Sequence, residues 1–200
     1  MRLHVFFEDM LGSKAKVKVL RMLFKFKAKT FTGRELAESI GLTHTGVRRA
    51  LRELQASNLI RVEYHGRSNL ITLNTDSCMY NVLQTLFDAE ANTFYSFIQE
   101  LKKDIPQGII VSCAVFGSVA RGTEKPGSDV DVLFITDTKE AVQKFMEDKL
   151  QFFVKRYGNV ISPYIMSKNE FVRKMNTPFV KGILESYKLV KGEDLWKLIQ

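Results

Sequence analysis

The chain has 200 residues, of which 30 are Lys or Arg, 22 are Asp or Glu and 2 are Cys. This length provides for one large domain or two small ones, each able to bury a core. Two cysteines, without Cys and His at metal-ligand spacing, argue against a disulfide framework and a structural zinc site, and they favour a cytoplasmic location. The sequence has no run of 18 apolar residues and no signal-peptide pattern, so no membrane partner is expected.

The basic excess is concentrated in the first third of the chain. Residues 1–77 contain 14 Lys and Arg against 7 Asp and Glu, a net charge of +7, whereas residues 78–200 contain 16 against 15, a net charge of +1. A local excess of this kind predicts a polyanionic partner for the first region specifically. A generic basic surface is the alternative that charge by itself leaves open.

The first predicted elements are helices. Residues 13–27 have apolar side chains at helical spacing, with lysines and Arg21 on another face. Residues 32–35 match a capping box that opens a short helix through Ile40. The Gly41-Leu42 pair then predicts a turn.

Thr43 is placed to cap the next helix, which has two distinct faces. Its apolar residues recur at i, i+3, i+4 and i+7, and they are Val47, Ala50, Leu51 and Leu54. The roughly opposite face carries Thr45, Arg48, Arg49 and Arg52. One face is therefore predicted to pack on a core and the other to be a cationic surface.

A β-hairpin with a basic tip follows at residues 59–73, with a predicted turn at His65-Gly66. The order of helix, helix, turn, helix and hairpin over residues 13–74 resembles a winged helix-turn-helix DNA-binding domain. That resemblance implies double-stranded DNA as partner, with contacts from the major-groove helix and the wing at His44, Thr45, Arg48, Arg49, Arg52 and Arg67. A solvated arginine face and a protein-protein module are the alternatives.

A short polar joint at residues 74–77 separates this region, residues 1–77, from a second domain, residues 78–200. Residues 80–103 then form a long amphipathic helix, broken at residues 104–108. The apolar stripe of this helix packs on the sheet of its own domain or serves as the seam of a homodimer. A dimer is expected, because a single winged helix contacts only a short site and symmetric half-sites are the usual remedy.

The strongest motif lies between two apolar runs of the second domain. Gly117-Ser118 ends the first run, and Ser128-Asp129-Val130-Asp131 opens the second. On a strand, residues i and i+2 project to the same face, so Asp129 and Asp131 are predicted side by side. Two carboxylates hold Mg²⁺ well when phosphate oxygens complete its coordination.

This pattern resembles the signature of the DNA polymerase beta superfamily of nucleotidyltransferases, in particular its minimal nucleotidyltransferase domains. The resemblance implies an α+β fold with a mixed sheet flanked by helices, a nucleoside triphosphate ligand, and Mg²⁺ held by Asp129 and Asp131, which are also the catalytic residues. It further implies nucleotide contacts from Gly117, Ser118, Arg121, Gly122 and Ser128. The bland alternative is a Gly-rich turn beside two solvated acids.

One departure from the family is a missing acid. Active members carry a third carboxylate on the next strand, which is expected here at residues 159–167 after a helix at 139–157 and contains no Asp or Glu. Asp137 and Glu170 are not obvious substitutes. Binding of nucleotide and Mg²⁺ is therefore expected to survive while transfer is weak. Helices are predicted at 168–175 and 178–186, and residues 177–192 resemble the C-terminal region of family members with a preceding winged helix.

Three functions follow from these patterns, and the sequence leaves open whether the chain is an enzyme. The leading hypothesis is a transcriptional regulator whose nucleotidyltransferase-fold domain binds a nucleoside triphosphate with Mg²⁺. The second is an active enzyme that transfers a nucleotidyl group to a hydroxyl of a small molecule, a protein or an RNA. The third is an antitoxin-like partner of a helical toxin.

Overall fold

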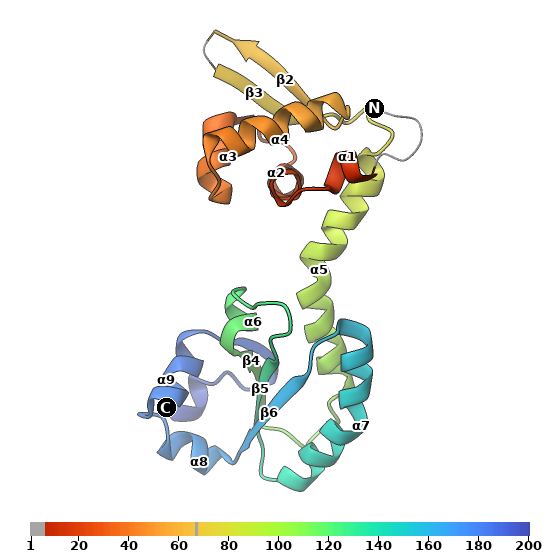
Figure 1. Cartoon of the computed structure of the whole chain (residues 1–200). Coiled ribbons are helices and arrows are strands. Elements are labelled where there is room, and N and C mark those ends of the chain that lie inside the picture. The colour runs from red at the N-terminus through yellow and green to blue at the C-terminus, as the bar shows by residue number, and fades with distance from the viewer. Residues whose placement is uncertain (1–6, 67) are drawn as a thin grey trace. The chain divides into compact units, whose positions relative to one another are not determined.

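The computed structural model describes residues 7–66 and 68–200, and the chain divides into two compact units, Met1–Asn92 and Thr93–Gln200 (Figure 1). In the described part of the chain, no helix is both long and apolar enough to cross a membrane. Each unit has a core of its own, which agrees with the two-domain prediction.

The first unit has the winged helix-turn-helix arrangement. Its helices are α1 (Phe7–Leu11), α2 (Lys14–Lys25), α3 (Gly33–Ile40) and α4 (His44–Ala56), and its strands are β1 (Phe31–Thr32), β2 (Ile60–His65) and β3 (Ser68–Leu73). The three strands form one antiparallel sheet in the order β1-β3-β2. The sequence predicts His65 in the turn of the hairpin, but the residue belongs to strand β2 and pairs with Ser68.

The predicted helix starts are confirmed by their hydrogen bonds. The Ser13 side chain accepts from the Lys16 amide at the start of α2, and the Thr43 side chain accepts from the Gly46 amide at the start of α4. Thr32 and Glu35 form a complete capping box on α3. Each cap satisfies an amide that the helix itself cannot pair, which fixes where these three helices begin.

A long helix, α5 (Tyr80–Asp104), follows the joint at residues 74–77, as the apolar spacing predicts. Leu83 and Phe87 from its first half lie in the core of the first unit, where the rings of Phe87 and Phe24 stack with centroids 5.2 Å apart. The division by contacts therefore falls inside α5, after Asn92. The domain boundary predicted after Ser77 stays a prediction.

The second unit is built around a four-stranded mixed sheet. Its strands are β4 (Ser112–Phe116), β5 (Val130–Ile135), β6 (Ile161–Met166) and β7 (Lys188–Gly192), in the order β6-β5-β4-β7. Strands β5 and β6 are parallel, and the other pairs are antiparallel. The helices are the second half of α5, α6 (Gly117–Arg121), α7 (Lys139–Tyr157), α8 (Lys168–Arg173) and α9 (Pro178–Glu185), with a final 3-10 turn at Lys197–Ile199.

The two faces of this sheet pack against different helices. Val130, Val132 and Phe134 of β5 share a core with α7 and the second half of α5, whereas Leu133 and Ile135 share a core with α8 and α9. Figure 1 shows α7 on one side of the sheet and α8 and α9 on the other. The predicted α+β fold with a mixed sheet flanked by helices is confirmed.

Two strands escaped prediction. β1 has only two residues, too few for any period, and is defined by pairing of Phe31 with Ile71. β7 follows α9 and pairs with β4, and its lysines obscure the apolar alternation. The ammonium group of Lys191 donates a hydrogen bond to the carbonyl oxygen of Ile105 at 2.7 Å. Position in the sheet, and not apolar pattern, makes both segments strands.

Candidate functional site

The two motif carboxylates lie where β5 begins. Asp131 pairs with Phe116 of β4 on one side and with Ser162 of β6 on the other. The sequence predicts Asp129 on the strand, but the residue lies one position before β5. Its side chain nevertheless accepts a hydrogen bond from Ser162 Oγ at 3.2 Å. The alternation of β5 puts Asp131 on the same face as Leu133, the face that α8 and α9 cover.

Gly117 is held against the Asp131 carboxylate. It follows β4 with φ of +74°, a conformation that L side chains rarely adopt. A β-carbon added at this position would overlap the carboxylate oxygen Oδ2 of Asp131. The glycine is therefore required by the turn into α6 and, independently, by the space that Asp131 occupies.

The electrostatics of Asp131 favour a bound proton or cation. Partial burial raises the pKa of this carboxyl above its usual value, the negative charge of Asp129 raises it further, and the positive charge of Arg121 acts in the opposite direction. Two like charges held close together and partly desolvated cost free energy until a cation neutralises them. A cation close to both carboxylates would relieve this repulsion.

Of the remaining predicted nucleotide contacts, Ser118 and Arg121 lie on α6, whereas Gly122 and Ser128 lie on the connection between α6 and β5. Gly122 caps the C-terminus of α6 with φ of +67°, and the Ser118 carbonyl oxygen accepts from the amide of Thr123 at 2.9 Å. Ser128 accepts from the Lys125 amide at 3.0 Å through its hydroxyl. Local hydrogen bonds thus shape this connection, and they give Gly122 and Ser128 structural roles whether or not nucleotide is bound.

Strand β6 carries no acid at the position facing the carboxylates. Ser162 is both the partner of Asp131 in the parallel ladder and the hydrogen-bond donor to Asp129. It therefore occupies the place on the neighbouring strand from which a third carboxylate would meet the other two. The sequence alone located the strand, and the register identifies the residue.

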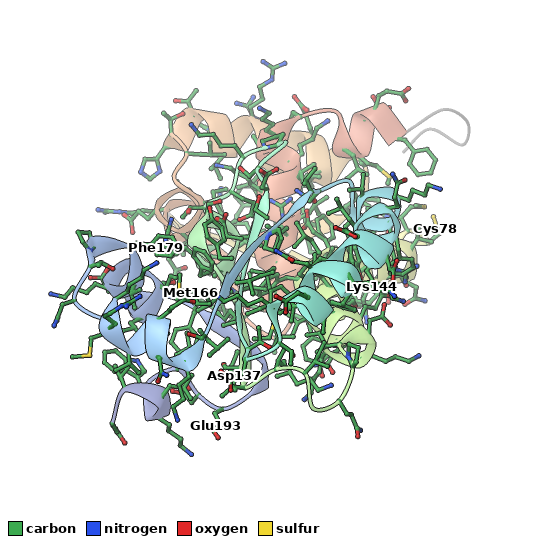
Figure 2. The ribbon with its side chains drawn as sticks, turned by 90° about the horizontal axis from the view of Figure 1, so that it is seen from below. Cys78, Asp137, Lys144, Met166, Phe179 and Glu193 are labelled. Carbon is green, nitrogen blue, oxygen red and sulfur yellow. The ribbon has the colours of Figure 1, made fainter. Side chains whose placement is uncertain are left out.

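The two acids considered as substitutes lie elsewhere. Asp137, labelled in Figure 2, comes after the far end of β5, in the turn that leads to α7. Glu170 belongs to the capping box of α8 with Ser167, and its carboxylate accepts from Lys139 Nζ at 2.7 Å. These contacts lower the pKa of Glu170 to about 2, so this carboxylate is a poor proton acceptor near neutral pH.

The donor set fits one hard cation that phosphate oxygens help to coordinate. Asp129 and Asp131 supply carboxylate oxygens, which Mg²⁺ prefers. Within the described residues no group of three or more His, Cys, Asp or Glu side chains forms a closed metal site. The arrangement suits a metal that arrives with a nucleotide better than a permanently bound ion.

An aromatic cluster that the sequence did not predict lies beside the carboxylates. The ring centroids of Phe116 and Tyr164 are 5.2 Å apart, those of Phe116 and Phe179 are 5.8 Å apart, and those of Tyr164 and Phe179 are 5.4 Å apart. The three rings come from β4, β6 and α9, so no sequence spacing could have connected them. Figure 2 shows Phe179 and Lys144 of α7 on opposite sides of the sheet.

In the first unit, the predicted DNA-binding face is exposed. His44, Thr45, Arg48, Arg49 and Arg52 are all exposed on α4, whereas the apolar residues of the same helix are buried. The amphipathic prediction for this helix is therefore confirmed. Arg67, predicted for the wing, lies outside the described residues.

The arginines of this face differ in their local partners. Arg49 pairs with Glu53 at 3.0 Å, and Glu53 also pairs with Lys16 at 3.1 Å, a lysine whose side chain is almost fully buried. Among the described residues, no ion pair joins Arg48 or Arg52 to an acid. Arg48 and Arg52 are therefore the arginines of α4 most available to a polyanion.

Comparison with known proteins supports the nucleotidyltransferase fold of the second unit. A family model for the nucleotidyltransferase domain matches residues 95–190. Two proteins of Methanocaldococcus jannaschii, both provisionally named protein adenylyltransferases, are similar to this chain. One is 35% identical over 111 residues, which cover 53% of this chain and 75% of the relative. The other is 30% identical over 96 residues, which cover 48% of this chain and 92% of the relative.

The chain therefore belongs to the nucleotidyltransferase domain family. A solved structure of MepR, a transcription regulator of the Staphylococcus aureus multidrug efflux pump MepA, is 21% identical and covers 49% of this chain and 74% of its own, with a TM-score of 0.38. The winged-helix assignment of the first unit rests on its own order of helices and strands and on its sheet topology.

Proposed function

We propose that this protein is a DNA-binding regulator whose nucleotidyltransferase domain binds a nucleoside triphosphate together with Mg²⁺ and transfers the nucleotidyl group slowly. The observation that carries the proposal is the pairing of Asp131 with Ser162, beside Asp129, at the start of β5. Two carboxylates are enough to help hold one metal against phosphates. The residue that should accept the proton of the attacking hydroxyl is a serine.

In this proposal the residues of the chain have separate roles. Asp129 and Asp131 hold Mg²⁺, which neutralises phosphate charge and orients the triphosphate. Gly117 keeps the backbone clear of the Asp131 carboxylate, and the exposed Arg121 adds positive charge near the phosphates. Ser162, a neutral hydroxyl, is a far weaker proton acceptor than a carboxylate, so the acceptor hydroxyl is not efficiently deprotonated.

The DNA-binding part rests on the first unit. The helix-turn-helix and hairpin topology, the net charge of residues 1–77 and the exposed arginines of α4 together support binding of duplex DNA, with α4 in the major groove. Arg48 and Arg52 would contact DNA directly, and Arg49 would exchange Glu53 for phosphate. Arg67 remains a proposed contact.

A second candidate is an active nucleotidyltransferase. The names of the two Methanocaldococcus jannaschii relatives favour transfer of an adenylyl group to a protein. For this chain, such an activity requires a proton acceptor from another source, such as a partner chain. The winged helix would then target the enzyme.

Incubation with labelled ATP, GTP, CTP and UTP in the presence of Mg²⁺ tests both candidates. The leading proposal expects bound nucleotide with little self-labelling or pyrophosphate release, and steady transfer at about 1 per second or faster contradicts it. Ser162→Asp sharpens the test, because it introduces the absent carboxylate. We expect transfer to rise on the order of 100-fold in this variant and not in the neutral control Ser162→Asn.

A further inference from the structure

Two rings of the aromatic cluster remain exposed although the core beside them buries other large rings. Phe116 is 7% exposed and supports the other two rings, while Tyr164 and Phe179 remain 38% and 41% exposed. Phe171, in the same core, is fully buried, so this face of the unit can bury a large ring. Single exposed aromatic side chains are common, but here two exposed rings, with their planes 39° apart, meet over a buried third and form one apolar surface.

This surface adjoins the carboxylates through the strands themselves. Phe116 directly precedes Gly117 and pairs with Asp131, and Tyr164 is two residues beyond Ser162 on the same face of β6. At the rise of a strand, two residues correspond to roughly 6 to 7 Å. In a ligand whose phosphates lie at the carboxylates, a group that is separated from the phosphates by about the length of one sugar can therefore reach the rings.

We propose that Tyr164 and Phe179 form a stacking platform for the base of the nucleoside triphosphate, with Phe116 as its support. This assignment rests on the proposed nucleotide binding and deepens it. Aromatic side chains stack on every base, because each base has a π-face, so the platform selects by ring area and not by hydrogen-bond pattern. ATP and GTP should consequently bind more tightly than CTP and UTP.

Calorimetry with two ligands separates the platform from the phosphate site. Mg²⁺-ATP carries a base, whereas Mg²⁺-tripolyphosphate carries only the phosphates. For Tyr164→Ala/Phe179→Ala, we expect ATP affinity to fall about tenfold or more and tripolyphosphate affinity to stay within about twofold of wild type. Tyr164→Phe/Phe179→Tyr, which keeps both rings, should retain ATP affinity.

The matched control is Phe152→Ala. Phe152 is 43% exposed and lies on α7, and among the described residues its ring pairs with that of Phe153. It should change neither affinity. Circular dichroism and thermal melting of each variant verify that it is folded, and a double variant that loses both ligands together with its folded structure assigns the rings to packing and overturns the proposal.

The remaining outcomes are distinct. Wild-type protein that binds tripolyphosphate but shows no additional affinity for ATP overturns the platform while the metal site stands. Wild-type protein that binds neither ligand overturns the proposed function and the platform together. Unchanged ATP affinity in the double variant, with a raised KM for an acceptor, assigns the rings to the acceptor and also overturns the platform.

Discussion

The two units present their candidate surfaces in different ways. In the first unit, the cationic face is the outer side of one helix, α4, and its residues follow from the period of that helix. In the second unit, the candidate site joins residues from β4, the start of β5, β6 and α9. A surface on one element can be derived from local sequence, whereas a site shared among strands depends on register.

The metal carboxylates give the largest expected effect in the second unit. Replacing Asp129 and Asp131 by Asn removes two charged ligands, so the affinity for Mg²⁺-ATP should fall on the order of 100-fold. Calorimetry with and without EDTA measures this change. Asp137→Asn, at the other end of the same strand, is the matched control, and equal affinity of the double variant and wild type would refute the metal site.

In the first unit, the corresponding test is Arg48→Ala/Arg49→Ala. Because DNA binding releases counterions from phosphates, we expect weaker binding in a gel-shift titration and a salt slope smaller by about 2. Lys102→Ala/Lys103→Ala removes the same charge from the exposed end of α5 and should leave affinity nearly unchanged. If both double variants bind DNA as wild type does, the arginine face is a solvated surface.

A smaller effect is expected at the proposed dimer seam on α5. Val82 and Leu86 are 55% and 51% exposed and lie one helical turn apart on the same face. Val82→Glu/Leu86→Glu should shift the protein from dimer to monomer in light scattering, whereas Val172→Glu on α8 should not. A wild-type mass of 23.0 kDa at micromolar concentration would contradict the dimer that the sequence predicts.

The smallest predicted effect is a pH dependence that Asp131 introduces. Its pKa is raised in the folded protein, so its stabilising contribution is present below the unfolded pKa and is lost as pH rises through the folded pKa. Without Mg²⁺, Asp131→Asn should therefore stabilise the protein near neutral pH, by at most about 1 kcal/mol because solvent screens a partly exposed group.

Urea unfolding of wild type and Asp131→Asn at several pH values measures this difference. Added Mg²⁺ should raise the stability of wild type and leave the variant nearly unchanged, since a cation relieves the repulsion with Asp129. A variant that is less stable than wild type at neutral pH in the absence of metal would show that Asp131 is not under electrostatic strain.

The sequence by itself determined the elements that carry their own signals. Capping residues such as Thr32 and Thr43 fixed helix starts, and the two-sided period of α4 fixed its buried and exposed faces. The Gly117-Ser118 pair and the spacing of Asp129 and Asp131 identified the nucleotidyltransferase motif. Each of these signals acts within a few residues, so no tertiary structure is needed to detect it.

Tertiary structure decided which distant residues complete the site. Parallel pairing of β5 with β6 put Ser162 beside the carboxylates, and the packing of α9 brought Phe179 to Tyr164. The ion pair between Glu170 and Lys139 makes Glu170 a poor substitute for the absent acid. Register is set by the whole sheet and its helices, and a shift of one residue would turn every side chain of β6 to the other face.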